Sequence, residues 1–288
     1  MKYGIREICD VVLKTKANQK IGNKMFYKGE PVIYFDTLKT SSLEGAATTV
    51  YAQGGRGNSR LVAWEGERTL TFTMEDALIS TTGLLILTGA GLIEPENTEE
   101  KYIPVHVIET TDVFDKVTVE GGLDGETTEA IDITVEKEVL FDDNATVYVM
   151  VLKDGDFNTE PYIGSVSPAG NNIVRIVAND NYTPDLSTFE GAEAVIVDYY
   201  YKATSGIQQI EITPDKFGGN YYLEASTLFR DTNGVDMPAE FIIPNCKVQS
   251  NFTFTMASSG DPSTFTFTMD AFPDYTKFNK KTKVLAAI

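Results

Sequence analysis

Residue types that catalyse reactions are few in this chain and lie far apart in its sequence. It contains one His, His106, and two Cys, Cys9 and Cys246. A Ser-His-Asp or Cys-His site needs a His held beside a nucleophile, and no motif of that kind accompanies His106. A structural zinc site needs about four Cys or His ligands. We therefore expect neither nucleophilic catalysis nor zinc binding, and we expect both Cys to be reduced and packed.

Two segments partly match ligand-binding loops. Four side chains alternate like the oxygen ligands of a calcium loop: Asp154, Asp156, Asn158 and Glu160. Thr159 and Ser165 stand where such a loop requires Gly and Glu, so a hairpin turn is the alternative. The segment Gly54–Gly57 is rich in Gly, but no Gly-Lys-Ser/Thr follows, as a phosphate loop would require. We expect no bound metal, no cofactor and no enzymatic activity.

The elements that would position any site are mainly β-strands, and a repeated tetrapeptide marks them. Thr-Phe-Thr-Met occurs at Thr71–Met74, Thr253–Met256 and Thr266–Met269. Its period of two places Phe and Met on one face of a strand and Thr on the other. Because copies lie near both ends of the sequence, we expect the two ends to contribute to one sheet system.

The last two copies predict a β-hairpin between Phe252–Met256 and Thr264–Met269. The segment that joins them contains Ser, Gly, Asp and Pro, which are turn residues. The expected core residues of this hairpin share one face: Phe252, Phe254, Phe265 and Phe267.

The sequence that follows the first copy of the tetrapeptide predicts a helix. Residues 73–76 match a capping box, and an apolar run follows that ends at Gly89–Gly91. This pattern predicts a strand over 69–73 and then a helix of about four turns. Upstream, residues 37–60 are rich in Thr, Ser and Gly, which predicts a long loop that is functional or mobile.

The net charge of −18 is concentrated in the middle of the chain. Residues 109–200 contain 20 acidic and 4 basic residues, and their short apolar segments alternate with turn residues. This composition argues against nucleic-acid binding by the segment and is typical of a solvated antiparallel sandwich. We expect residues 110–203 to form an inserted, acidic, immunoglobulin-like domain. Residues 1–109 and 204–288 would then form the two parts of the other domain.

Longer stretches at both ends resemble the major tail tube proteins of long-tailed bacteriophages. The resemblance covers roughly the first 95 and last 80 residues. It rests on seven stretches: Thr40-Ser-Ser-Leu-Glu-Gly45, Val50-Tyr-Ala-Gln-Gly-Gly55, Leu61-Val-Ala-Trp-Glu-Gly-Glu-Arg-Thr-Leu-Thr-Phe-Thr-Met-Glu-Asp-Ala-Leu78, Tyr222-Leu-Glu-Ala225, Phe229-Arg230, Phe241-Ile-Ile-Pro-Asn245 and Phe252-Thr-Phe-Thr-Met-Ala-Ser-Ser-Gly-Asp-Pro-Ser-Thr-Phe265. The middle segment lies outside it and resembles immunoglobulin-like decorations of phage tails.

The resemblance implies a mainly β fold: a sandwich or barrel with one flanking helix. It implies that copies of the chain form stacked, hexameric rings, through which DNA passes without specific binding. Further partners would be the tail sheath and the completion or baseplate proteins. The protein would act in the virion tail and be assembled in the host cytoplasm. We expect no membrane partner, since no apolar stretch is long enough to span a membrane.

In such a ring, the segment 37–60 would be an assembly loop, disordered in the free subunit and ordered against a neighbour. Its candidate contact residues are Leu43, Val50, Tyr51 and Arg56. Two other interpretations remain: a β-rich binding module or adhesin, and another virion part such as a capsid decoration or baseplate protein. Exposed aromatic residues would favour a binding module, and Tyr199–Tyr201 is the one aromatic cluster that suggests it.

Overall fold

The computed structural model describes residues 2–5, 7–121, 126–141, 145–158, 160–178, 186–253, 258–259 and 264–287. The chain divides into two compact units. Unit 1 consists of Met1–Ile93 and Ile210–Ile288, and unit 2 of Glu94–Gln209. Each unit contains one large antiparallel sheet, and the described residues contain one α-helix, so the expected mainly β fold is confirmed.

The sheet of unit 1 has nine strands in the order β5-β2-β19-β20-β21-β7-β6, with β1 beside β19 and β24 beside β20. Its strands are β1 (Tyr3–Ile5), β2 (Asp10–Thr15), β5 (Pro31–Phe35), β6 (Leu38–Gly54), β7 (Ser59–Asp76), β19 (Asn220–Asp231), β20 (Asp236–Val248), β21 (Phe265–Ala271) and β24 (Leu285–Ala287). Three two-stranded sheets accompany it: β3 (Gln19–Ile21) with β4 (Lys24–Phe26), β8 (Gly91–Ile93) with β18 (Gln209–Glu211), and β22 (Asp274–Tyr275) with β23 (Lys281–Thr282).

Two copies of the repeated tetrapeptide lie side by side in this sheet. In the β7–β21 pair, Phe267 is opposite Met74 and Met269 is opposite Phe72. All four side chains are buried in the core of unit 1, because the alternation places them on the same face. The expectation that both ends of the sequence contribute to one sheet is therefore confirmed.

The predicted hairpin around the last two copies has a different partner strand. β21 pairs with β20 on one side and with β7 on the other. Phe252 and Thr253 belong to no strand, and 254–256, which includes Phe254, lies outside the described residues. Phe267 is buried, whereas Phe265 and Phe252 are half-buried and pack against the same core.

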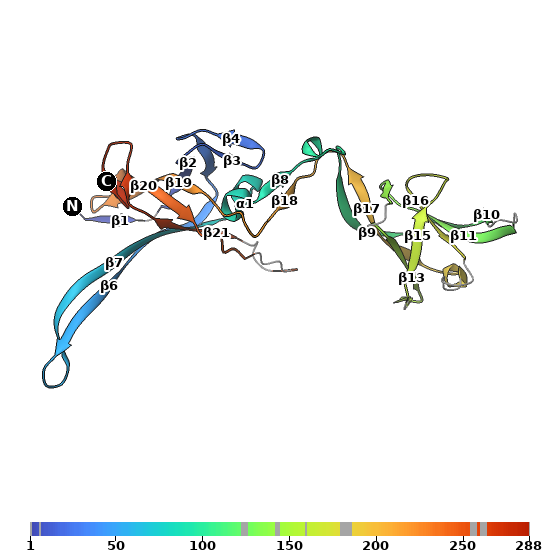
Figure 1. Cartoon of the computed structure of the whole chain (residues 1–288), viewed down its shortest axis with the longest axis horizontal. Helices are drawn as coiled ribbons and strands as arrows, with labels where there is room; N and C mark the ends of the chain where they lie inside the picture. Colours follow the sequence, from blue (N-terminus) through green and yellow to red (C-terminus); the bar gives the residue numbers. More distant parts are fainter. Residues whose placement is uncertain are drawn as a thin grey trace. The chain divides into compact units, whose positions relative to one another are not determined.

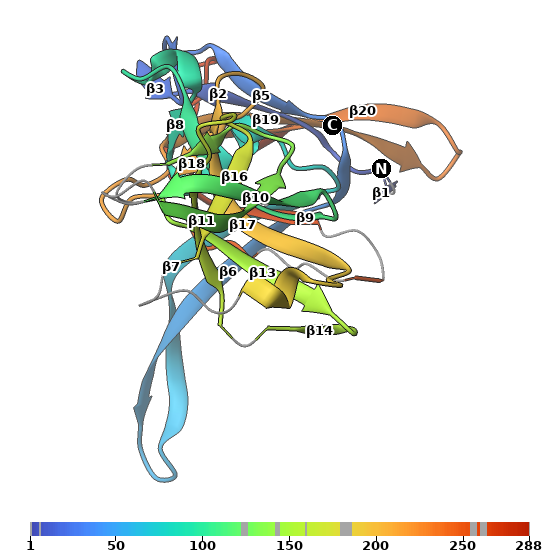
Figure 2. The same cartoon turned by 90° about the vertical axis from the view of Figure 1, so that its right-hand side faces the viewer.

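The expectation of a long loop over residues 37–60 is wrong. These residues form most of a long antiparallel hairpin, in which β6 and β7 pair from Leu38 opposite Asp76 to Gly54 opposite Ser59. The hairpin projects away from the rest of unit 1 (Figures 1 and 2). Gly55 and Gly57 have φ of 78° and 90° in its turn, a conformation that Gly adopts without strain.

The prediction of a four-turn helix is also wrong, because the helix begins later in the sequence and is shorter than expected. β7 continues to Asp76, since that residue still pairs with Phe265 of β21. The helix α1 spans Thr81–Thr88, and its N-cap is Ser80, whose hydroxyl accepts a hydrogen bond from the Gly83 amide at 3.0 Å. Gly89 ends the helix in the left-handed conformation, as the sequence predicted.

Unit 1 has its core between α1 and one face of the sheet. Ile86 and Leu87 of the helix belong to the same buried cluster as Phe72, Met74 and Met269. Cys9 and Cys246 are buried in this cluster too, and neither forms a disulfide.

Burial protects both thiols from reagents. It raises the pKa of Cys9, and it raises the pKa of Cys246 to about 12. The reactive thiolate is therefore scarce at pH 8, and the sulfur atoms are covered. We expect a disulfide reagent such as DTNB to titrate no thiol within minutes at pH 8 in native protein and two thiols in denaturant. Rapid modification of the native protein would contradict this placement of Cys246.

Unit 2 forms the second nine-stranded sheet, in the order β10-β11-β16-β15-β13-β17-β12, with β14 beside β13 and β9 beside β17. Its strands are β9 (Ile103–Thr111), β10 (Phe114–Gly121), β11 (Glu126–Thr134), β12 (Val139–Leu140), β13 (Val147–Lys153), β14 (Asp156–Phe157), β15 (Tyr162–Val166), β16 (Ile173–Val177) and β17 (Ala194–Ala203). Two 3-10 turns, η1 (Pro95–Asn97) and η2 (Leu186–Phe189), complete it.

The core of unit 2 is one buried cluster, to which strands from both halves of the sheet contribute. It contains Ile133 of β11 and Val174 of β16 together with Val149 of β13 and Val197 of β17. The unit begins before the expected border at residue 110, because β9 pairs with β17 over nine residue pairs. With this border, unit 2 contains 24 acidic and 6 basic residues and unit 1 contains 18 of each.

Candidate assembly surface

The face of the unit 1 sheet opposite α1 carries small polar side chains in cross-strand rows. One row joins Thr268, Thr73 and Ser42 across β21, β7 and β6. The adjacent rows contain Lys247, Asp270, Thr71 and Glu44, and then Thr266, Glu75 and Thr40. We call these residues the threonine face.

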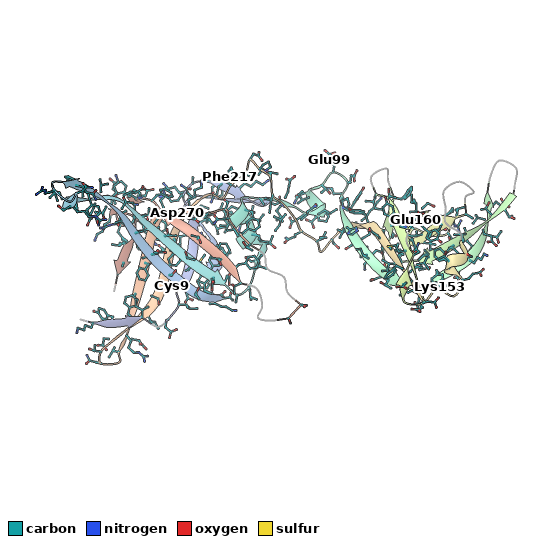
Figure 3. The ribbon with its side chains drawn as sticks, turned by 90° about the horizontal axis from the view of Figure 1, so that it is seen from below. Cys9, Glu99, Lys153, Glu160, Phe217 and Asp270 are labelled. Carbon is teal, nitrogen blue, oxygen red and sulfur yellow. The ribbon has the colours of Figure 1, made fainter. Side chains whose placement is uncertain are left out.

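Hydrogen bonds from Thr71 and from the nearby Gln249 hold the Asp270 side chain of the threonine face. Gln249 donates to both carboxylate oxygens of Asp270 at 3.1 Å, and the Thr71 hydroxyl donates to Asp270 at 3.4 Å. Asp270 is labelled in Figure 3. The threonine face contains three acidic residues, Asp270, Glu44 and Glu75, and one basic residue, Lys247. The face is therefore mildly acidic.

The sheet ends in two strands that have a partner on one side only. Within the described residues, β5 pairs with β2 alone and β6 pairs with β7 alone. Such edges present backbone N–H and C=O groups that another chain can pair with. The edge of β6 is unusually long, since this strand has 17 residues.

The outer part of the β6–β7 hairpin, residues 42–69, packs against no core and is called the arm. Its residues are exposed on both faces, apart from the half-buried Ala52 and Gly54. From Gly45, opposite Leu70, to its turn the arm rises nine residue steps, about 30 Å at 3.3 Å per residue. It reaches well beyond its own subunit's core.

One face of the arm is apolar although it is exposed. Val50 lies directly opposite Trp64, with exposed fractions of 62% and 55%. Val62 lies on this face too, since it is two residues from Trp64. Together they form the apolar arm face: Val50, Val62 and Trp64. A contiguous exposed apolar surface of this kind marks an interaction site in soluble proteins.

The four residues predicted for the assembly loop all lie on this hairpin. Leu43 is opposite Phe72 at the arm's base, and Arg56 is in the turn. Tyr51 lies on the other face from Val50, with the Arg60 guanidinium 4.1 Å from its ring centroid. The prediction missed Trp64, the only Trp in the chain, because it was assigned to a separate strand after a loop.

The segment that partly matches a calcium loop forms an ordinary turn. Residues 154–155 are the turn between β13 and β14, in which Lys153 pairs with Asp156 (Lys153 is labelled in Figure 3). Asn158 accepts a hydrogen bond from the Val151 amide at 2.7 Å.

His106 Nε2 lies 2.7 Å from an Asp198 oxygen on the surface of unit 2. The described part of the chain has no cluster of three or more His, Cys, Asp or Glu that could hold a metal ion.

The Tyr199–Tyr201 run does not form an exposed aromatic platform. Tyr199 is fully buried, Tyr200 is 36% exposed and Tyr201 is half-buried, as expected from alternation along β17. The Tyr199 hydroxyl donates to Glu109 at 2.7 Å, and burial together with this carboxylate raises the pKa of Tyr199. The cluster therefore packs unit 2 and lends no support to a binding module.

No helix within the described ranges combines the length and the apolarity needed to cross a bilayer. The mainly β chain has a projecting hairpin and, within its described residues, two sheet edges with which another chain could pair. The sequence pattern of the YomU/Tube protein family matches residues 4–150 and 166–287. The chain therefore belongs to this family of phage tail tube proteins, which are structural components of the virion tail.

The family match also covers most of unit 2, residues 94–150 and 166–209. The expectation that the resemblance stops at the borders of the middle segment is therefore wrong. No curated protein matches the sequence significantly.

Proposed function

We propose that this protein is the subunit of stacked, six-membered rings that form the tube through which phage DNA passes. The observation that carries the proposal is the unit 1 sheet, in which β5 and β6 each pair with a single strand among the described residues. Pairing of the β5 edge of one copy with the β6 edge of the next would continue one sheet around a ring. Such closure also removes the exposed edges, which otherwise promote aggregation.

The threonine face suits the inner wall of such a ring. Most of its side chains are short, and its acids outnumber its single Lys. A mildly acidic wall repels the DNA phosphates, so the genome slides past without specific binding. The opposite face of the sheet is covered by α1 and faces away from the lumen in this arrangement.

The arm supplies the second contact of the proposed assembly. Its apolar face is exposed in the free subunit, and its length of about 30 Å suits a contact with a neighbouring subunit or ring. Burial of Val50, Val62 and Trp64 would remove their apolar surface from contact with water and so stabilise the interface.

Unit 2 is proposed to be an insertion of immunoglobulin-like type, carried on the outside of the tube. Its acidic excess supports this placement, since 18 net negative charges per copy would repel each other less on the outer circumference. Sheath, completion and baseplate proteins remain the proposed partners of the assembled tube.

Negative-stain electron microscopy of the purified protein, together with sedimentation analysis, tests the proposed function. We expect rings or stacked tubes and a concentration-dependent sedimentation coefficient. A protein that stays monomeric at every concentration tested would contradict the proposal and favour a binding module. A glycan array would then be the next measurement.

A further inference from the structure

Four neighbouring strands of unit 2 carry apolar side chains on the face that points away from the core. Val149 of β13 and Val197 of β17 are buried in that core, so the residues that alternate with them face outward. One cross-strand row of outward residues crosses β15, β13, β17 and β9: Ile163, Tyr148, Asp198 and Ile108. The next row contains Met150, Ile196 and Thr110.

The apolar side chains of these rows are exposed and form a groove. Ile108 is 62% exposed, Ile163 is 60% exposed and Tyr148 is 42% exposed. The groove has a volume of about 510 Å³ and is lined by Ile108, Tyr148, Met150, Pro161, Ile196 and Asp198. We call the apolar members of this set, together with Ile163, the apolar face of unit 2. A contiguous exposed apolar surface marks an interaction site in soluble proteins.

The charge around this apolar face is mainly negative. Asp198 is the acidic residue among those that line the groove, and its side chain is 42% exposed although His106 lies beside it. Glu160, which is labelled in Figure 3, immediately precedes the groove residue Pro161 and is exposed as well. Unit 2 as a whole has 24 acidic and 6 basic residues. An occupant of the groove therefore meets a negative potential.

This combination of apolar surface and negative charge favours one kind of occupant. A second copy of unit 2 would bring its own 18 net negative charges and be repelled. A glycan would need several polar groups to fix its hydroxyls, whereas the groove offers mostly aliphatic side chains, one aromatic ring and one carboxylate. A polypeptide segment with both apolar and basic side chains matches the surface and the charge.

We propose that the apolar face of unit 2 docks a basic segment of a partner protein. Apolar side chains of the segment would cover Ile108, Tyr148 and Ile163, which removes their surface from water. A Lys or Arg of the segment would pair with Asp198, with its aliphatic stem along the groove. Charge complementarity would speed the encounter and orient the segment. The inference concerns unit 2 alone and does not depend on the ring arrangement proposed for unit 1.

Binding of three labelled peptides to the full-length protein, followed by fluorescence anisotropy at 150 mM salt, tests the inference. The first peptide has eight residues that alternate Lys and Leu. The second alternates Lys and Ser and keeps the charge, and the third alternates Glu and Leu and keeps the apolar side chains. We expect the Lys-Leu peptide to bind at least about tenfold more tightly than either of the others, because only this peptide matches both features of the groove.

Three variants locate the bound peptide. Ile108→Ser with Ile163→Ser should weaken binding of the Lys-Leu peptide at least about tenfold, since both side chains lose apolar surface. Asp198→Asn, which keeps the shape of the side chain, should weaken it about two- to fivefold, because an exposed ion pair contributes little. The matched control is Val177→Ser, which removes an exposed apolar side chain from β16 and should leave binding unchanged. Circular dichroism checks that each variant is folded.

Four results would overturn the inference. Equal binding of the Lys-Leu and Lys-Ser peptides would show attraction to acidic surface in general. Lys-Leu binding that the folded double Ile variant leaves unchanged would place the peptide elsewhere. Loss of self-association in this variant, measured by sedimentation, would make the apolar face an interface between copies. Glycan-array binding that the same variant abolishes, without binding of any peptide, would assign the face to a glycan. A wild-type protein that stays monomeric contradicts the proposed ring function but leaves this test intact.

Discussion

Replacement of residues 46–69 by Asn-Gly is expected to leave unit 1 folded and to abolish assembly into rings and tubes. Gly45 and Leu70 are directly opposite each other, so a two-residue turn can join them without a change of register. The deleted residues contribute nothing to the buried core. Circular dichroism and the thermal midpoint should therefore match the wild type, while electron microscopy shows no assembled particles.

Two point variants separate the apolar arm face from the arm as a whole. Val50→Asp places a charge on this face, opposite Trp64, whereas Thr49→Asp places the same charge on the other face, opposite Glu65. We expect Val50→Asp to weaken assembly at least about tenfold more than Thr49→Asp, since only the former puts a charge into an apolar contact. Normal tubes from the deletion variant would show that the arm has no part in assembly.

Phe267→Ala is expected to lower the free energy of unfolding of unit 1 by about 3–5 kcal/mol. Phe267 is 3% exposed, and its ring meets the Phe35 ring edge-on at a centroid distance of 5.0 Å. Removal of the ring leaves a cavity between α1 and the sheet that the two cannot close fully. The loss is large against a typical total stability of about 5–15 kcal/mol.

The matched control for this variant is Thr266→Ala, the neighbouring residue on the threonine face. Thr266 is exposed, and we expect its replacement to cost under about 1 kcal/mol in the free subunit. Urea unfolding followed by circular dichroism compares the two, and only the transition of unit 1 should move. Equal losses from both variants would contradict the assignment of Phe267 and Thr266 to opposite faces.

Strands with one buried face could be predicted from the sequence, because apolar and polar residues alternate along them. A strand with one buried face must place apolar residues at every second position, and Phe72, Met74, Phe267 and Met269 do so. Which strands become neighbours is a property of the whole sheet, so the sequence did not reveal that β21 lies between β20 and β7.

The arm escaped prediction for a physical reason. A hairpin exposed on both faces has no buried face, so its residues need not alternate, and its Thr, Ser and Gly content resembles that of a loop. The Gly54–Gly57 cluster beside the strand-like segment 61–64 was the available signal, since a Gly-rich turn between two β-rich segments predicts a hairpin.

The helix start was misplaced because a capping-box pattern stands before the true N-cap. Thr73 and Asp76 have the spacing of a capping box, but long-range pairing with β21 keeps this segment extended. The true N-cap, Ser80, stands three residues before Gly83 instead of Glu or Gln, so it lacked half of the pattern. Pairing between strands distant in sequence decided the outcome.

The central claim is that the exposed arm becomes an interface between subunits, and the fluorescence of Trp64 measures this directly. Trp64 is the only Trp of the chain and is 55% exposed in the free subunit, so all Trp emission reports on the apolar arm face. On assembly, its emission should shift to shorter wavelength and lose its sensitivity to iodide quenching. Emission and quenching that stay the same in the monomer and in the assembled particle would contradict the claim.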